Sequence, residues 1–323
     1  MTDINTLLIL PRLRVQAANA VSGPLTWGFP SPTAFTGFAH ALERRLAADL
    51  PAGFQGVGII CHRFEPQVFR PAGSFTRVFC LTRNPVGKDG GTAALVEEGK
   101  AHLELTLVIG LADWVPEDDR SAMLAVISNA VMSMRLAGGS VLPQRSGKHY
   151  EPRMETWPSA EADRRDTFRR LRRHWLPGFA LALREDRLAE ALQHLRESDA
   201  QATALDAMLD MARLNIEPNV EPESDGSTHW HIRRRDGWLV PLPVGYAGLT
   251  ELYEPGQVLN CRDAQTPVRF VESIYSLGEW VSPHRLDCLE QLLWHHEADP
   301  ETGIYRCINR YTDYQNSANN GIA

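Results

Sequence analysis

Lysine is almost missing from this 323-residue chain. Only Lys88, Lys100 and Lys148 occur among its 33 basic residues, so thirty are arginines. The guanidinium group of arginine makes planar, forked contacts with phosphates and base edges and stacks on bases, although GC-rich coding gives the same bias. The 40 acidic residues leave a net charge of −7, which argues against an indiscriminate binder of polyanions.

Cysteine is also scarce. The five cysteines are widely separated, which argues against a disulfide framework and against a zinc ribbon. No segment approaches the roughly 20 apolar residues of a membrane span, and the N-terminus lacks the basic and apolar regions of a signal peptide. We therefore expect a cytoplasmic protein with reduced cysteines and no membrane partner.

Catalytic and cofactor motifs are missing as well. The sequence has no P-loop, no Gly-x-Ser-x-Gly, no His-Glu-x-x-His and no Gly-x-Gly-x-x-Gly. Two histidine pairs, His229 with His231 and His295 with His296, resemble ligand pairs, but no nearby carboxylate or cysteine completes a metal set. The sequence therefore predicts neither a metal nor a cofactor.

Hydrophobic periodicity predicts an α+β fold. The first 150 residues read as strand, helix, strand, strand, helix, strand, which is the βαββαβ order of ferredoxin-like and RNA-recognition domains. In such a domain two helices cover one face of the sheet and leave the other open. The four strands of this order are predicted at 6–15, 54–64, 102–109 and 140–142, with a further strand at 76–82 in extra material between about 65 and 100. The predicted helices are 32–46, capped by Ser31, and 121–136, ended by Gly138 and Gly139.

Three regions are expected along the chain. Residues 1–150 form the RNA-recognition-type domain, with a protruding hairpin inserted at about 65–100. Residues 151–215 form an arginine-rich helical segment, and 216–323 form a second mixed α+β region. In addition, 144–160 reads as a linker, and the segment after Pro283 reads as a helix that ends near His296.

The helical segment contains six arginines among residues 164–173. On a helix, Arg165, Arg169 and Arg172 share one face, with Arg170 and Arg173 beside them. This cluster indicates contact with phosphates or with a partner protein. The alternative is a solvated helix whose arginines pair with acidic residues of the same chain.

Two loops could also contact RNA. Gly138 and Gly139 allow a close approach of a ligand, and exposed N–H groups there can hold phosphate oxygens; a simple helix cap is the alternative. The second loop, Pro24–Thr33, brackets Trp27 and Phe29 with prolines. Either ring could stack on a base, although such rings commonly fill a core.

Many short blocks resemble a known family. They include Leu8–Leu13, Pro24–Pro32, Gly58–Glu65, Leu81–Pro85, Arg135–Ser140, Leu176–Ala180, Gly237–Pro241 and Gly278–Arg285. In this order they resemble the second Csy subunit of type I-F CRISPR surveillance complexes, from about residue 7 to about 310. The resemblance is patchy at 144–175 and at 217–228.

The resemblance implies a RAMP-superfamily protein with a modified RNA-recognition fold and no catalytic activity. Such a subunit pairs with the large Csy subunit, caps the 5′ handle of the CRISPR RNA, and contacts the adjacent backbone subunit. It meets target DNA through the assembled complex. The insert at 70–99 would match the hairpin that such subunits lay across the guide.

We expect RNA contacts from arginines, backbone N–H groups and aromatic rings. One alternative is a metal-independent endoribonuclease using His62 or His284 beside an arginine, since some relatives in another CRISPR subtype process the repeat. Another is a purely structural adaptor for the large subunit. The expected contacts are Trp27, Arg63, Arg83, Asn84, Arg135, Gly138, Gly139, Ser140 and Arg285.

Overall fold

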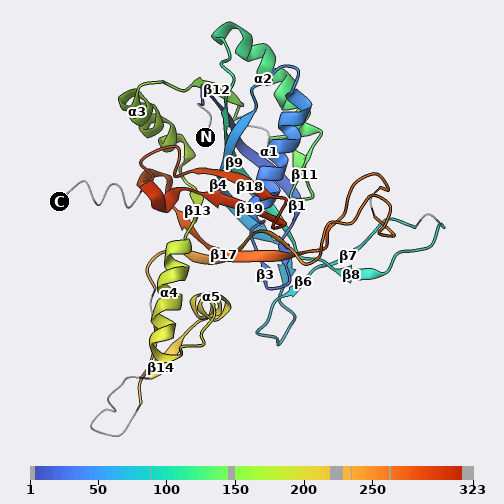
Figure 1. Ribbon diagram of the computed structural model, residues 1–323, viewed down its shortest axis with the longest axis vertical. Helices are drawn as coiled ribbons and strands as arrows, with labels where there is room; N and C mark the ends of the chain where they lie inside the picture. The colour runs from blue at the N-terminus through green and yellow to red at the C-terminus, as the bar shows by residue number, and fades with distance from the viewer. Residues whose placement is uncertain are drawn as a thin grey trace.

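The computed structural model of the chain describes residues 4–87, 89–144, 150–218, 228–233, 235–261 and 263–314. It is a mixed α+β protein, as the sequence predicts, and it is built on one large antiparallel sheet (Figure 1). Within these ranges, no helix combines the length and the apolarity needed to cross a membrane.

The main sheet has 11 strands in the order β10-β11-β1-β9-β4-β13-β17-β16-β19-β18, and β12 also pairs with β1. Its strands are β1 (Thr6–Asn19), β4 (Phe54–Pro66), β9 (Lys100–Leu111), β10 (Arg135–Leu136), β11 (Gly139–Leu142), β12 (Arg153–Thr156), β13 (Phe179–Leu183), β16 (Leu239–Gly248), β17 (Val271–Val281), β18 (Leu293–Asp299) and β19 (Ile304–Asn309).

Four small ribbons lie outside this sheet. They pair β2 (Val21–Gly23) with β3 (Thr26–Trp27), β5 (Val68–Phe69) with β6 (Val78–Phe79), β7 (Leu81–Arg83) with β8 (Leu95–Glu97), and β14 (Ile216–Pro218) with β15 (Trp230–Ile232). The helices are α1 (Pro32–Leu46), α2 (Glu117–Met132), α3 (Glu161–Arg172), α4 (Glu185–Ser198) and α5 (Ala204–Ala212), with 3-10 turns η1 (Arg173–Trp175) and η2 (Pro283–Arg285).

Helix α1 begins where the sequence predicts. The Ser31 hydroxyl accepts a hydrogen bond from the Thr33 N–H at 3.1 Å, and Pro32 occupies the first turn. Its apolar stripe, which includes Phe35 and Leu42, is buried against the sheet. Capping and periodicity, both contained in one segment, therefore made the bounds of α1 predictable from the sequence.

Helix α2 corrects the second helical prediction. It begins at Glu117 and ends at Met132 instead of spanning 121–136. Leu136 continues the helical spacing of apolar residues, but it is buried as part of strand β10. Both strand and helix can bury such a residue, so spacing alone could not locate this helix end.

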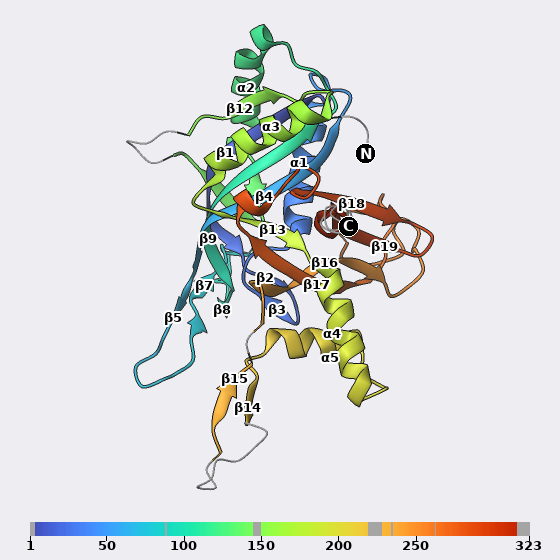
Figure 2. The ribbon, with the colours of Figure 1, turned by 90° about the vertical axis from the view of Figure 1, so that its left-hand side faces the viewer.

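The second face of the sheet is not fully open, contrary to the expectation. All four residues of the run Leu7–Leu10 in β1 are buried, although neighbouring residues in a strand point to opposite faces. Leu8 and Leu10 belong to the core that includes α1, while the other two pack with Phe168, Leu171 and Trp175. Figure 2 shows α3 in front of the sheet with α1 behind it.

The strands of the main sheet after residue 178 extend it beyond β4, and the strand β18 then pairs with β4 again. Strand β13 pairs with β4 at Ile60 and Cys61, and β18 pairs with β4 at Val57 and Gly58. One edge of β4 is thus shared by two strands that lie far away in the sequence.

Two further sequence predictions are wrong in this part of the chain. The expected linker at 144–160 contains β12, which pairs with the start of β1. The expected helix after Pro283 is the short turn η2, followed by β18. Leu286, Leu289 and Leu292 have helical spacing, but they are buried in turns against the second face of the sheet.

The insert at 65–100 does protrude, as two ribbons instead of one hairpin. Ribbon β7–β8 extends away from the sheet at the right of Figure 1. Helices α4 and α5 lie below the sheet in the same view, with β14 at the far end.

Candidate nucleic-acid interface

The glycines of the loop after α2 build a tight hairpin. Arg135 pairs with Ser140 and Leu136 with Gly139, leaving Ala137 and Gly138 as a two-residue turn. Both turn residues have positive φ, 50° and 75°, as a type I′ turn requires. The glycines therefore form a β-hairpin and do not end a helix, which corrects that prediction.

Position 139 requires glycine because of close packing, and not because of its backbone angle. A Cβ atom there would lie 2.7 Å from the Gln16 carbonyl oxygen and 2.7 Å from the Ala18 nitrogen, both in strand β1. The absence of a side chain lets β11 lie close to β1. This places Arg135 and Ser140 at a defined position on the sheet edge.

Part of the sheet's second face lies beyond α3 and carries polar side chains. Directly opposed residues of antiparallel strands project to the same face. Ser140 lies opposite both Arg135 and Gln16, and Glu104 lies opposite both Arg14 and Arg63. We call this surface the open half-face; its residues are Arg14, Gln16, Arg63, Glu65, His102, Glu104, Arg135 and Ser140, most of which line a shallow hollow of about 110 Å³.

Two arginines of the open half-face have no carboxylate within ion-pair distance among the described residues. Arg14 donates to the Pro143 carbonyl at 2.9 Å, and Arg135 donates to the Gly138 carbonyl at 3.1 Å. By contrast, Arg63 pairs with Glu65 at 2.7 Å. Arg14 and Arg135 thus keep an uncompensated positive charge, which suits contact with phosphates.

Beside the open half-face lies a cavity of about 560 Å³. Arg63 lines both surfaces and marks their boundary. We call this the aromatic cavity, because its wall includes six aromatic rings, those of Trp27, Phe29, Phe64, Phe179, Trp238 and Trp280. The structure thus brings the predicted residues Trp27 and Arg63 to one site.

His62 has a structural position between these two surfaces. It occupies a bulge of β4, its Nδ1 lies 2.7 Å from the Pro177 carbonyl, and its Nε2 lies 2.7 Å from the Thr106 hydroxyl. Thr106 also accepts the Arg12 N–H. Burial lowers the pKa of His62 to about 4. A neutral ring with both nitrogens engaged does not support the role of a general base, so this geometry does not support the endoribonuclease alternative.

The buried His62 should make stability depend on acid. Between its ordinary pKa of 6.5 and its native value of about 4, only the unfolded chain binds the proton, so the free energy of unfolding falls as pH falls. One such proton contributes at most about 1.4 kcal/mol per pH unit. We expect His62→Gln to flatten the dependence measured by urea unfolding at pH 7, 6 and 5.

His284→Gln is the matched control, because His284 is exposed and bonds only to Ser282 among the described residues. Burial also lowers the pKa of His295, so some acid dependence stays in every variant. Equal slopes for the parent chain and His62→Gln would contradict the assignment.

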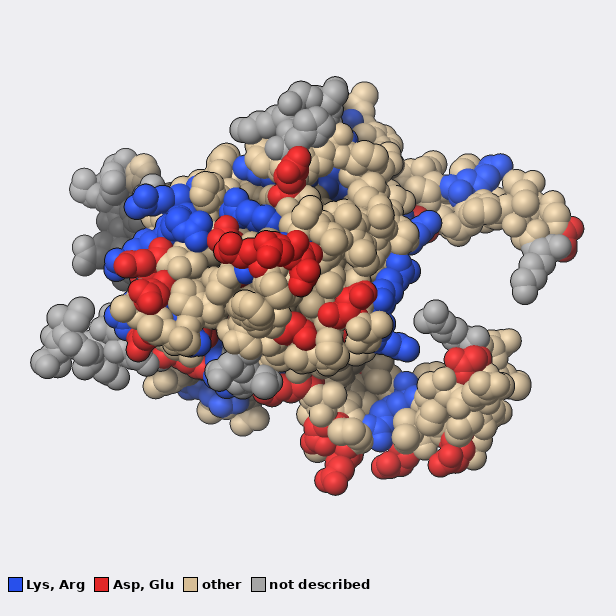
Figure 3. Space-filling view, turned by 90° about the horizontal axis from the view of Figure 1, so that it is seen from above, with Lys and Arg blue, Asp and Glu red and all other residues tan. Residues whose placement is uncertain are grey.

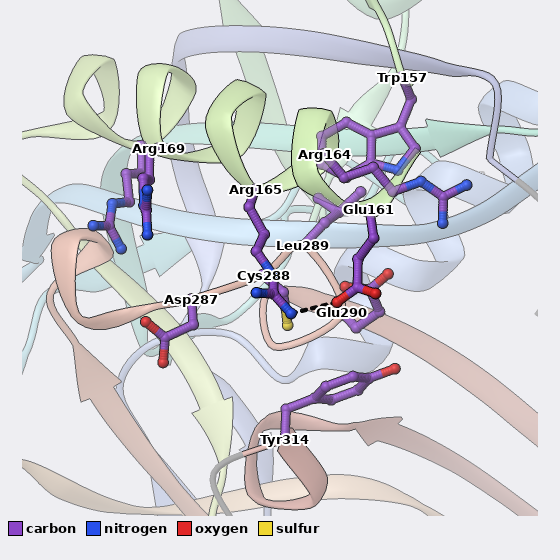
Figure 4. A pocket seen from close by; sticks show the side chains of 11 residues that line it. Trp157, Glu161, Arg164, Arg165, Arg169, Asp287, Cys288, Leu289, Glu290 and Tyr314 are labelled. Carbon is purple, nitrogen blue, oxygen red and sulfur yellow. Dashed lines mark hydrogen bonds and ion pairs between the residues drawn. The ribbon is translucent and has the colours of Figure 1, made fainter. Parts of the chain in front are cut away.

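The arginines of α3 line a third surface, a pocket of about 970 Å³ (Figure 4). Across it lie Asp287, Cys288 and Glu290, and burial raises the pKa of the Cys288 thiol to about 12, which keeps it protonated. Most of the predicted cluster already has partners: Arg165 pairs with Glu161, Arg169 with Asp166 at 3.4 Å and Arg170 with Glu155 at 3.0 Å, while Arg172 donates to the Leu286 carbonyl.

Arg173 is exposed and has no ion pair among the described residues. On the face shown in Figure 3, basic and acidic side chains are interspersed over much of the surface. The pairing on α3 matches the sequence-based alternative of a helix neutralised within its own chain. A phosphate at Arg165, Arg169 or Arg170 would have to displace a carboxylate.

The other predicted contacts are dispersed. Arg83 ends strand β7, and Asn84 follows it on the same projecting ribbon. Arg285 lies in η2, next to the α3 side of the sheet. All three are exposed, and neither the open half-face nor the aromatic cavity includes them.

Sequence reasoning missed several residues of these surfaces. Arg14 and Gln16 alternate with Leu13 and Val15 in β1, and this alternation was a readable signal for a half-open strand. Phe179, Trp238 and Trp280 gave no local signal, because only the pairing of distant strands brings them together.

Comparison with known proteins gives a consistent result. The sequence profile of the family described as "CRISPR-associated protein (Cas_Csy2)" matches residues 8–307. The chain is also 50% identical, over 313 residues, to a protein of Pseudomonas aeruginosa (strain UCBPP-PA14) named "CRISPR-associated protein Csy2". That alignment covers 95% of this chain and 96% of the relative.

Proposed function

Because the chain belongs to the Cas_Csy2 family of CRISPR-associated proteins, we propose that it is a non-catalytic, RNA-binding subunit of a type I-F surveillance complex. In this role it holds the 5′ handle of the CRISPR RNA together with the large Csy subunit. The adjacent backbone subunit and, through the assembled complex, target DNA are its other partners.

The proposal includes an RNA-recognition-type module of the ferredoxin-like class in residues 1–150. It is supported by the order β1, α1, β4, β9, α2, β11 along the chain and by the antiparallel order β11-β1-β9-β4 in the sheet. Residues 151–215 and 216–323 add the helical segment and the second α+β region, which enlarge this module.

The observation that carries the proposal is the open half-face. RNA-recognition modules bind single strands on an exposed sheet surface, where polar groups hold phosphates and rings stack on bases. Here Arg14 and Arg135 lie on such a surface without carboxylate partners among the described residues, and Ser140 accompanies them. The aromatic cavity adjoins it through Arg63.

The remaining predicted contacts have a place in this proposal. Arg83 and Asn84 project on ribbon β7–β8, where they can follow RNA beyond the handle. Another group of arginines lies on the second face of the sheet, across its covered part from the open half-face. This group comprises Arg173, Arg285 and the paired arginines of α3, and its position suits contact with a protein partner.

Co-purification tests the proposal directly. The full chain is expressed with the large subunit, with and without a CRISPR array, and the bound RNA is sequenced from its 5′ end. We expect a stable pair that retains RNA with a uniform 5′ handle. A pair without RNA would instead support the adaptor alternative, and cleavage of repeat RNA in EDTA would overturn the non-catalytic assignment.

Arg14→Ala combined with Arg135→Ala should weaken handle binding and reduce its salt dependence. Each phosphate contact contributes about 0.7 to the slope of log affinity against log salt for a single strand, so the double variant should lose roughly 1.4. The measurement is a titration of handle RNA into the pair at several salt concentrations. Arg187→Ala, on α4, is the control; an unchanged slope would remove both arginines from the interface.

A further inference from the structure

The aromatic cavity has an unusual surface for a folded protein. Three large rings from separate parts of the chain converge there and remain exposed: Trp27 at 54%, Phe179 at 42% and Trp238 at 57%. Converging exposed apolar groups mark binding sites, whereas scattered ones need no explanation. We therefore expect the site to bind a ligand with a flat apolar surface.

Two of these rings, those of Phe179 and Trp238, are held in place by further aromatic contacts behind them. Trp238 lies edge-on to Phe179 at 5.3 Å and 6.4 Å from Trp280, which in turn lies edge-on to Phe29 at 4.8 Å. Phe29 in turn stacks on Phe35 of α1, which is fully buried. This chain of contacts links the cavity wall to the core, so the site is formed before a ligand arrives.

Two polar features distinguish the ligand from an apolar side chain. Thr26 lines the cavity, and its buried hydroxyl has no hydrogen-bond partner among the described residues; such a group is costly unless a small rotation of the side chain lets a ligand satisfy it. At the rim, the ion pair of Arg63 with Glu65 is half-exposed and hence weak, so Arg63 can turn to an anion. A ring with hydrogen-bonding edges, attached to a phosphate, meets both requirements.

We propose that the aromatic cavity takes up a single unstacked base of single-stranded RNA, with Arg63 on the neighbouring phosphate. This inference rests on the proposed function and specifies where one base of the bound RNA lies. Aromatic rings accept any base face, so the cavity supplies affinity, while the Thr26 hydroxyl contributes selectivity at the base edge.

The test uses the full chain paired with the large subunit, and a set of synthetic handle RNAs. Each RNA carries 2-aminopurine at one successive position, because its fluorescence reports stacking. We expect one position whose fluorescence changes on binding and reverts in the Trp238→Ala pair. Stacking of one base is worth enough that Trp238→Ala should weaken handle binding about 10-fold.

Matched variants keep the test interpretable. Trp114→Ala removes an equally exposed ring that does not line the cavity and should bind as the parent does. Trp238→Phe keeps an aromatic face and should restore most of the affinity. Phe179→Ala removes a second ring of the same site and should give a loss at the same position of the RNA.

Two results would overturn the inference without touching the proposed function. One is normal RNA binding in which no base responds to Trp238→Ala or Phe179→Ala. The other is loss of the large subunit in both variants with RNA binding intact, which would identify the occupant as a protein side chain. A parent pair that binds no handle RNA at all would instead overturn the proposed function.

Discussion

Arg184→Met should destabilise the chain by about 3–5 kcal/mol, because it leaves the buried carboxylate of Glu279 without its ion-pair partner. Glu279, on β17, is only 6% exposed and is ion-paired with Arg184. Arg184 also pairs with Asp186 at 2.8 Å, so a single guanidinium serves two acids. Removing it leaves Glu279 in the protein interior without an opposite charge.

Urea unfolding of the full chain measures this effect, with Arg187→Met as the control. Arg187 lies in α4, three residues after Arg184, which directly precedes that helix; its pair with Glu190 is exposed and should be worth less than about 1 kcal/mol. Adding Glu279→Leu to Arg184→Met should recover much of the lost stability, since the unpaired buried charge is then gone. A double variant as unstable as Arg184→Met would show that lost packing, and not the charge, was responsible.

Trp175→Ala should cost a comparable 3–5 kcal/mol, roughly the loss typical of a buried aromatic ring. Trp175 is 1% exposed, contacts Phe168 edge-on at 5.6 Å, and packs in the core on the second face of the sheet. We expect the loss to concentrate on α3, which this ring anchors. Hydrogen exchange should show faster exchange over α3 than over α1.

Trp175→Phe separates the ring from its N–H group. The Trp175 Nε1 atom is buried and has no hydrogen-bond partner among the described residues, so its removal sacrifices no bond. This variant should lose much less stability than Trp175→Ala, because the smaller ring leaves only a small cavity. Equal destabilisation by Trp175→Phe and Trp175→Ala would show that filling of this site by an aromatic ring is not what stabilises the core, and would contradict this account.

Local sequence signals predicted those helices and strands whose caps and apolar pattern lie within one short segment. Helix α1 has its cap, its proline and its apolar stripe within one segment, and β9 has clean alternation from Leu103 to Ile109. The end of α2 and the identity of β18 could not be predicted in this way. Leu136 and the leucines after Pro283 satisfy a helical spacing, and only the position of the sheet decides that the first is buried in a strand and the others in turns.

The residues of the candidate interface likewise fall into those that the sequence could identify and those that it could not. Arg135, Ser140, Arg63 and Trp27 were identified by residue type and by the family resemblance, and the structure places them on two adjoining surfaces. Part of the wall of the aromatic cavity comes from β13, β16 and β17, which join β4 through the long-range pairing of β13 with β4. Such a cavity has no sequence signature, because no short segment contains it.

The shared edge of β4 has a consequence for how the protein is made. Strands β11, β1, β9 and β4 are synthesised early, but the free edge of β4 stays without its partner strand β18 until residues 293–299 leave the ribosome. An uncovered strand edge is a template for aggregation, and contacts across nearly the whole chain form slowly. Fragments that stop short of β18 are therefore expected to be poor substitutes for the complete protein, and chaperones or early assembly would protect the nascent chain.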